Sequence, residues 1–187
     1  MDIDHNISRP YSIVPHDQEW PKRFEEIRKI LAQIWSGKAL AIEHVGSTSV
    51  SGMSAKPCID VMVVIEKPED FTEEVEAMVK AEYKQQVIDA EEGTVLSDAL
   101  WFYKAEPDGH KSENIHFRLR GSRSERSILL GRDYLRAHTE RVREYNKLKS
   151  ELLAQFPDNY LAYRDGKQNF MKETERLARE WRGEMSK

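Results

Sequence analysis

The sequence predicts an α+β protein, a mixed sheet flanked by helices and followed by a C-terminal helical block. Segments with the apolar patterns of strands gather in about residues 11–120, whereas about residues 121–185 are charged, with Leu, Tyr and Phe at helical spacing. Strands in one part and helices in another are typical of α+β proteins rather than of regular βαβ alternation. Because the 187 residues contain no repeat or low-complexity linker, we expect a single domain over residues 1–187.

The first helix is predicted to follow a short strand at residues 11–14. Asp17 is a capping residue type, and Pro21 falls in the first turn. Apolar residues at spacings of four and three then draw one stripe, made of Trp20, Phe24, Ile27, Leu31 and Ile34. We expect this stripe to cover a sheet.

Two strands with a turn at Gly46 between them follow. Residues 39–45 form the first, and residues 58–65 are an almost continuous apolar run, typical of a strand buried on both faces. Residues 68–81 predict a helix, and residues 83–88, 100–105 and 114–119 predict further strands, the last two joined by a turn at 107–109. From residue 123 we expect three helices, broken near 137–139 and at Pro157.

Composition and charge limit the function classes. The net charge of -4 is spread along the chain, which argues against bulk binding to nucleic acid or to an anionic membrane. Cys58 is the only cysteine, so no internal disulfide can form, and the N-terminus has neither a basic nor an apolar region. No apolar run approaches the roughly 20 residues that span a bilayer. We therefore expect a cytoplasmic protein.

Asp60 is a carboxylate inside an apolar strand, where it shares one face with Met62 and Val64. An ionised group in such surroundings needs a cation, several donors or a metal. A functional acid and a structural acid that ties down a loop both fit this placement.

The turn at Gly46 and Ser47 lies thirteen residues before Asp60. A glycine in such a turn lets backbone N–H groups converge on an anion, and Ser47 and Thr48 add hydroxyl groups. Lys56 stands at the entry to the Asp60 strand, where it either neutralises phosphate or lies solvated in a loop. Gly-Ser is also a common turn, so the prediction of a phosphate site depends on Asp60.

Two further candidates lie on neighbouring strands. His116 shares a polar strand face with Asn114 and Arg118. That face is either part of the pocket or exposed to solvent. Glu43 and His44 are adjacent, so only one of them can face the pocket from a regular strand.

Three cations align with apolar helix stripes in the C-terminal block. They are Arg132, Lys149 and Lys167, each three or four residues from Ile, Leu, Tyr or Phe. Snorkelling of the aliphatic stems explains any one of them. Three together favour an anion site.

These motifs resemble a known family. Ile-Glu-His-Val-Gly-Ser-Thr at residues 42–48, followed by Ala-Lys-Pro-Cys-Ile-Asp-Val at residues 55–61, is similar to the signature of the GrpB family. The resemblance covers nearly the whole chain, because Ile-His-Phe at 115–117, Arg-Asp-Tyr-Leu-Arg at 132–136 and the later Tyr and Lys positions at 145, 149, 163 and 167 also match.

The resemblance implies a nucleotidyltransferase-like fold, in which a Gly-Ser turn binds nucleotide phosphates and carboxylates on the next strand hold magnesium. Gly46, Ser47 and Asp60 match that pattern, but Met62 stands where the second carboxylate is expected. One aspartate is a poor ligand set for two-metal phosphoryl transfer. Asp60 with Glu43 or His116 as a site for one Mg²⁺ is the remaining metal hypothesis.

The sequence therefore predicts a protein that binds a nucleotide or another phosphorylated small molecule. Asp60, His116 and Glu43 are the candidate catalytic residues, and the candidate phosphate-binding residues are Gly46, Ser47, Thr48, Lys56, Arg132, Lys149 and Lys167. If the protein is an enzyme, nucleotidyl transfer is the expected reaction. The alternative is a non-catalytic domain that senses a ligand or supports a partner protein, which Met62 favours.

Overall fold

The computed structural model describes residues 11–67, 70–86 and 100–183. A five-stranded sheet with the order β1-β2-β5-β4-β3 organises them. Its strands are β1 (Ala39–Val45), β2 (Ile59–Ile65), β3 (Lys84–Gln85), β4 (Trp101–Ala105) and β5 (Lys111–Leu119). The sheet is mixed, as predicted, because β2 and β5 are parallel while the other neighbouring pairs are antiparallel.

Strand β2 lies between β1 and β5 and is the most buried of the strands. All its residues except Asp60 are buried, which confirms the strand predicted from the apolar run. Such a run needs cover on both faces, since each face of the strand carries apolar side chains.

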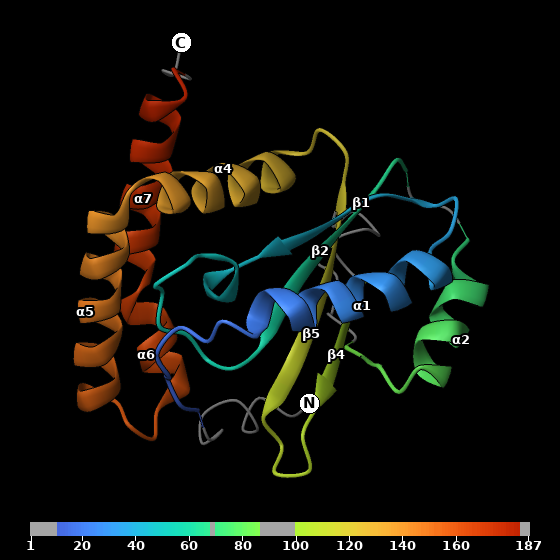
Figure 1. The fold of residues 1–187 in the computed structure, drawn as a ribbon, viewed down its shortest axis with the longest axis horizontal. Helices are drawn as coiled ribbons and strands as arrows, with labels where there is room; N and C mark the ends of the chain where they lie inside the picture. The colour runs from blue at the N-terminus through green and yellow to red at the C-terminus, as the bar shows by residue number, and fades with distance from the viewer. Residues whose placement is uncertain (1–10, 68–69, 87–99, 184–187) are drawn as a thin grey trace.

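One face of the sheet packs against α1 (Trp20–Ile34) and α2 (Thr72–Lys80), which lie on the same side in Figure 1. The predicted stripe is confirmed, because Trp20, Phe24, Ile27 and Leu31 are buried in this core. Asp17 is not the helix cap: its carboxylate accepts a hydrogen bond from the N–H of Glu19, one residue before the helix begins. The predicted strand at residues 11–14 reduces to one bridge between Val14 and Ala55, and part of the strand predicted at 83–88 lies outside the described residues.

Four helices follow the sheet within the described residues, one more than predicted. They are α4 (Arg123–Ala137), α5 (Thr139–Gln155), α6 (Tyr160–Gly166) and α7 (Gln168–Trp181). The additional break falls at Lys167, whose φ of -86° and ψ of -13° keep the chain close to helical geometry. The periodicity therefore continues across the break, although Gly166, a residue type common at helix ends, directly precedes it.

The second face of the sheet meets this helical block. Met62 and Val64 of β2 pack with Val45, and Ile128 and Leu129 of α4 lie against them. In Figure 1, α5, α6 and α7 stand beside one end of the sheet, and α4 runs from them across it. Asp60 is on this second face, since side chains alternate along the strand. Among the described residues, no helix has the length and apolarity that crossing a bilayer demands.

Candidate functional site

The bend after β1 and the acid of β2 lie in direct contact. Val45 pairs with Asp60 across the two strands, and the chain turns at Gly46, whose φ is 71° and ψ is -171°. This conformation is essentially restricted to glycine. A Cβ atom on Gly46 would lie 2.6 Å from Oδ2 of Asp60, so the missing side chain is also what lets the carboxylate approach the turn.

Asp60 is held by two residues of β5. Nδ2 of Asn114 donates to Oδ1 at 3.1 Å, and Nε2 of His116 lies 3.6 Å from the same oxygen. Burial alone raises the pKa of Asp60, but the hydrogen bond and charge of His116, with Asn114 and Lys56, lower it below the ordinary value. The side chain keeps 31% of its surface exposed. Asp60 is therefore an ionised acid that remains open to a cavity.

Three lysines surround a cavity of about 220 Å³ beside this acid, which we call the lysine cavity. Lys56, Lys149 and Lys167 line it together with Ser47 and Asp60. Nζ of Lys56 donates to the hydroxyl of Tyr160 at 2.8 Å, and Nζ of Lys149 donates to the carbonyl oxygen of Ser54. Nζ of Lys167 lies 4.6 Å from the ring centre of Tyr163. The structure thus brings together three of the four predicted cations, from three separate parts of the chain.

Burial and mutual repulsion weaken the basicity of two of these lysines. Burial, with the charge of Lys167, lowers the pKa of Lys149 to about 7. Burial also lowers the pKa of Lys167 to about 8, with Lys56 and Arg164 acting in the same direction and Asp60 opposing them. A bound anion would reverse these effects because it stabilises the charged ammonium form.

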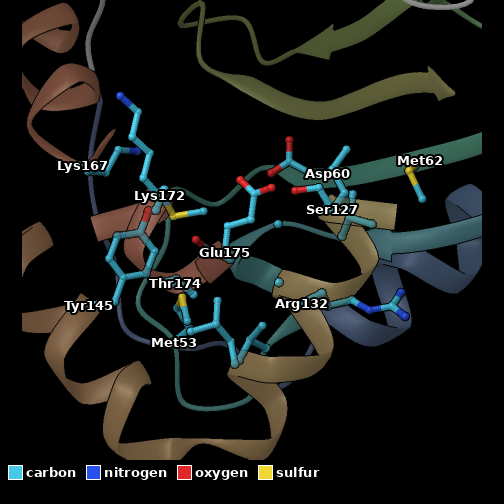
Figure 2. Close-up of a pocket in the computed structure, with 18 of the residues that line it drawn as sticks. Met53, Asp60, Met62, Ser127, Arg132, Tyr145, Lys167, Lys172, Thr174 and Glu175 are labelled. Atoms are coloured by element: carbon cyan, nitrogen blue, oxygen red, sulfur yellow. The ribbon is translucent and has the colours of Figure 1, made fainter. Parts of the chain in front are cut away.

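A second cavity, of about 630 Å³, adjoins the first and shares Ser47, Asp60, His116 and Lys167 with it. Figure 2 shows this cavity between the sheet and the C-terminal helices, with Asp60 on one side and Lys167 on another. Much of its wall is apolar, from Val45, Val50, Met53, Met62, Ile128, Leu135 and Tyr145. The predicted site is therefore the junction of a small cationic cavity and a larger, mainly apolar one.

Arg132 and Glu43 bind each other. Nη1 of Arg132 lies 2.7 Å from Oε2 of Glu43, and its Nε lies 2.8 Å from the carboxylate of Asp133. The guanidinium also donates to the carbonyl oxygen of His44 at 3.2 Å, and Figure 2 shows it directed away from Asp60. Arg132 therefore joins α4 to β1. Arg132 also lines the larger cavity, and its predicted phosphate contact stays a prediction.

His44 faces the opposite side of the sheet from Glu43. Its ring stacks on Phe24 at 4.7 Å, and Nε2 lies 3.0 Å from Oγ1 of Thr48. The hydroxyl of Thr48, predicted to bind phosphate, is thus engaged within the protein. Burial lowers the pKa of His44 to about 4, with Arg136 and Arg132 contributing and Asp60 opposing.

This lowered pKa predicts a loss of stability in acid. Between pH 6.5 and 4 the unfolded chain protonates His44 while the folded protein does not, so stability falls as pH decreases through this range. The contribution is about 3 kcal/mol. His44→Gln keeps a donor for Thr48 and removes the titration, so urea unfolding from pH 4 to 7 should show a flatter profile for the variant. Equal losses in the two proteins would exclude His44 as the source.

The acidic residues do not fit a metal centre. Among the residues that the structure describes, no three His, Cys, Asp or Glu side chains are grouped so that they could hold a metal ion. Asp60 is engaged by His116 and Asn114, Glu43 by Arg132, and Met62 offers a thioether rather than a carboxylate. The Mg²⁺ hypothesis therefore depends on Asp60 alone.

Several residues of the site escaped the sequence analysis. Tyr163 appeared there only as a position that matches the GrpB family, and Tyr160 was not singled out, yet both line the lysine cavity. Gly131 and Glu175 line the larger cavity from α4 and α7. No motif marks the latter two, because their position depends on how the helices pack.

A mixed sheet, helices on both of its faces and a cationic cavity beside the contact of Gly46 with Asp60 define an α+β protein with a candidate anion-binding pocket. A family model described as GrpB protein matches residues 10–176, and the chain belongs to the GrpB family.

Relatives and a solved structure agree with this assignment. The chain is 31% identical over 174 residues to UPF0157 protein YqkA of Bacillus subtilis, covering 93% of this chain and 49% of YqkA. It is 27% identical over 201 aligned positions to a dephospho-CoA kinase of Mycobacterium tuberculosis, covering 95% of this chain and 49% of the kinase. The crystal structure of conserved protein GrpB from Enterococcus faecalis superimposes with a TM-score of 0.73 at 30% identity, over 89% of this chain and 96% of the other. The chain thus spans about half the length of both sequence relatives.

Proposed function

We propose that this protein binds a nucleotide or another phosphorylated small molecule, with its phosphate in the lysine cavity. The observation that carries the proposal is the convergence of Lys56, Lys149 and Lys167 on one cavity. Within the described residues, none of the three ammonium groups forms an ion pair with a carboxylate. Asp60 supplies one negative charge to this partly buried space, and gathering three lysines there is unfavourable without a further anion. A phosphate group supplies both charge and acceptor oxygens.

The residues around the cavity have complementary roles in this proposal. The lysines donate to phosphate oxygens, and the hydroxyl of Ser47 donates from the turn. Asp60 and His116 lie where the two cavities meet. In a nucleotidyl transfer, His116 would accept the proton of the attacking hydroxyl, and Asp60 would orient its ring.

A second candidate function is non-catalytic, namely a ligand-sensing or accessory domain. Met62 in place of a second carboxylate favours it, because two-metal transfer lacks a ligand set here. The half-length matches to YqkA and to the dephospho-CoA kinase also favour it, since both are longer chains that contain a region like this one.

Calorimetry with nucleoside triphosphates, with and without Mg²⁺, separates the two functions. The enzyme hypothesis predicts binding together with release of pyrophosphate when a hydroxyl acceptor is supplied, and loss of turnover but not of binding in His116→Ala. The sensing hypothesis predicts binding with no turnover under any of these conditions. If no nucleotide or sugar phosphate binds, the phosphate proposal is wrong.

A further inference from the structure

The two cavities differ in chemistry, although they share one border. The smaller is lined by the three lysines together with Tyr160 and Tyr163, whereas Ile128, Leu135 and Met171 contribute apolar side chains to the larger. Charged side chains such as Lys172 and Glu175 also contribute to the larger cavity from α7. Ser47, Asp60, His116 and Lys167 border both spaces.

The volumes indicate which part of a ligand each cavity holds. About 220 Å³ is too small for most organic ligands, whose sites occupy roughly 300–1,000 Å³. The adjoining space of about 630 Å³ falls within that range. Cations such as Arg118, Arg164 and Lys172 also line it, but most of the surface that it exposes is apolar, which favours a hydrocarbon or aromatic group.

Gly131 provides an independent observation about the larger cavity. It lies in the middle of α4 and borders this cavity, where glycine lowers helix stability by roughly 1 kcal/mol relative to alanine. No packing requires it, because a Cβ atom there would meet nothing within 4 Å among the described residues. Gly166 of α6 differs, since a Cβ atom there would lie 2.4 Å from Leu152. The absence of a side chain at Gly131 therefore keeps space open in the cavity.

We infer that the ligand is a phosphate ester of a bulky, mainly apolar or aromatic alcohol, whose organic group occupies the 630 Å³ cavity while its phosphate lies among the lysines. The inference depends on the proposed phosphate site and extends it to the class of ligand. The ester oxygen would then lie at the shared border, beside Asp60 and His116. Inorganic phosphate and small sugar phosphates would leave most of the larger cavity unfilled.

Two phosphate monoesters with the same head group test the inference. Methyl phosphate needs only the lysine cavity, and 1-naphthyl phosphate adds an aromatic group for the larger one. Calorimetry should show that the wild-type protein binds 1-naphthyl phosphate at least tenfold more tightly. Equal affinities for the two esters would overturn the inference and leave the phosphate site intact, whereas failure of both to bind would refute the proposed function itself.

Substitutions at Gly131 locate the organic group. Gly131→Leu should fill part of the larger cavity without touching the lysine cavity, and Gly131→Ala is the matched control. The leucine variant should lose at least tenfold in affinity for 1-naphthyl phosphate and change less than twofold for methyl phosphate, and the alanine variant should bind both esters like wild type. Thermal unfolding should find both variants at least as stable as wild type. An unchanged preference for the naphthyl ester in Gly131→Leu would place the group elsewhere and overturn the inference.

Discussion

Gly46→Ala should lower the free energy of unfolding by about 3 kcal/mol, the largest effect on stability that we expect from one methyl group here. Two costs combine. The φ of 71° and ψ of -171° suit glycine, and the new Cβ atom would lie 2.6 Å from Oδ2 of Asp60. Relief of this clash displaces the turn that carries Ser47, so binding of phosphate should weaken as well. Urea unfolding measures the first effect and calorimetry with methyl phosphate the second.

Gly52→Ala is the matched control for this prediction. Gly52 also has a positive φ, of 74°, but a Cβ atom there meets nothing within 4 Å among the described residues. Its substitution should cost about 1 kcal/mol through the backbone alone and leave binding unchanged. If the two variants lose the same stability, the expected clash of the new Cβ atom with Asp60 adds no cost, and this part of the prediction is wrong.

Lys167→Met should have the largest effect on ligand binding, a ten- to hundredfold loss of affinity for methyl phosphate, because a charged donor to phosphate disappears. Lys167 borders both cavities, and burial lowers its pKa to about 8. Removing an ammonium that is costly to charge should not reduce stability, so unfolding cannot explain the lost affinity. Calorimetry and thermal unfolding of the same sample measure both quantities.

Lys172→Met is the matched control. It makes the same chemical change within α7, the helix that begins directly after Lys167. Lys172 is exposed and borders only the larger cavity. We expect its affinity for methyl phosphate to stay within twofold of wild type. A comparable loss in both lysine variants would mean that overall positive charge, rather than the lysine cavity, attracts the anion.

Local pattern was sufficient to predict the contact at the centre of the site. The apolar run of β2 fixed the face of Asp60, and a strand-turn-strand connection brought Gly46 to the same end of the sheet. Both features depend on alternation along a strand, which persists whatever packs above it. The mixed sheet, the first helical stripe and the family assignment followed from similarly local signals.

The roles of the charged side chains required the tertiary structure. Arg132 and Lys149 both align with apolar helix residues, but Arg132 meets Glu43, whereas Lys149 meets a backbone carbonyl group and the lysine cavity. The periodic pattern predicts that a side chain points inward, but it does not predict which group that side chain contacts. The larger cavity was also unpredictable, because it arises between β2, α4, α6 and α7, and its most informative residue, Gly131, lies in an ordinary helix.

The bend at Gly46, the acid of β2 and the three lysines should act together as a phosphate site. Calorimetric titration of the wild-type protein with methyl phosphate at pH 8.5, in two buffers of different ionisation enthalpy, measures both the binding and the protons that accompany it. The pKa values of Lys149 and Lys167, about 7 and about 8, leave both mainly neutral at this pH. Bound phosphate should raise both pKa values, so binding should take up between about one and two protons per ligand. Binding without proton uptake, or no binding, would contradict this prediction.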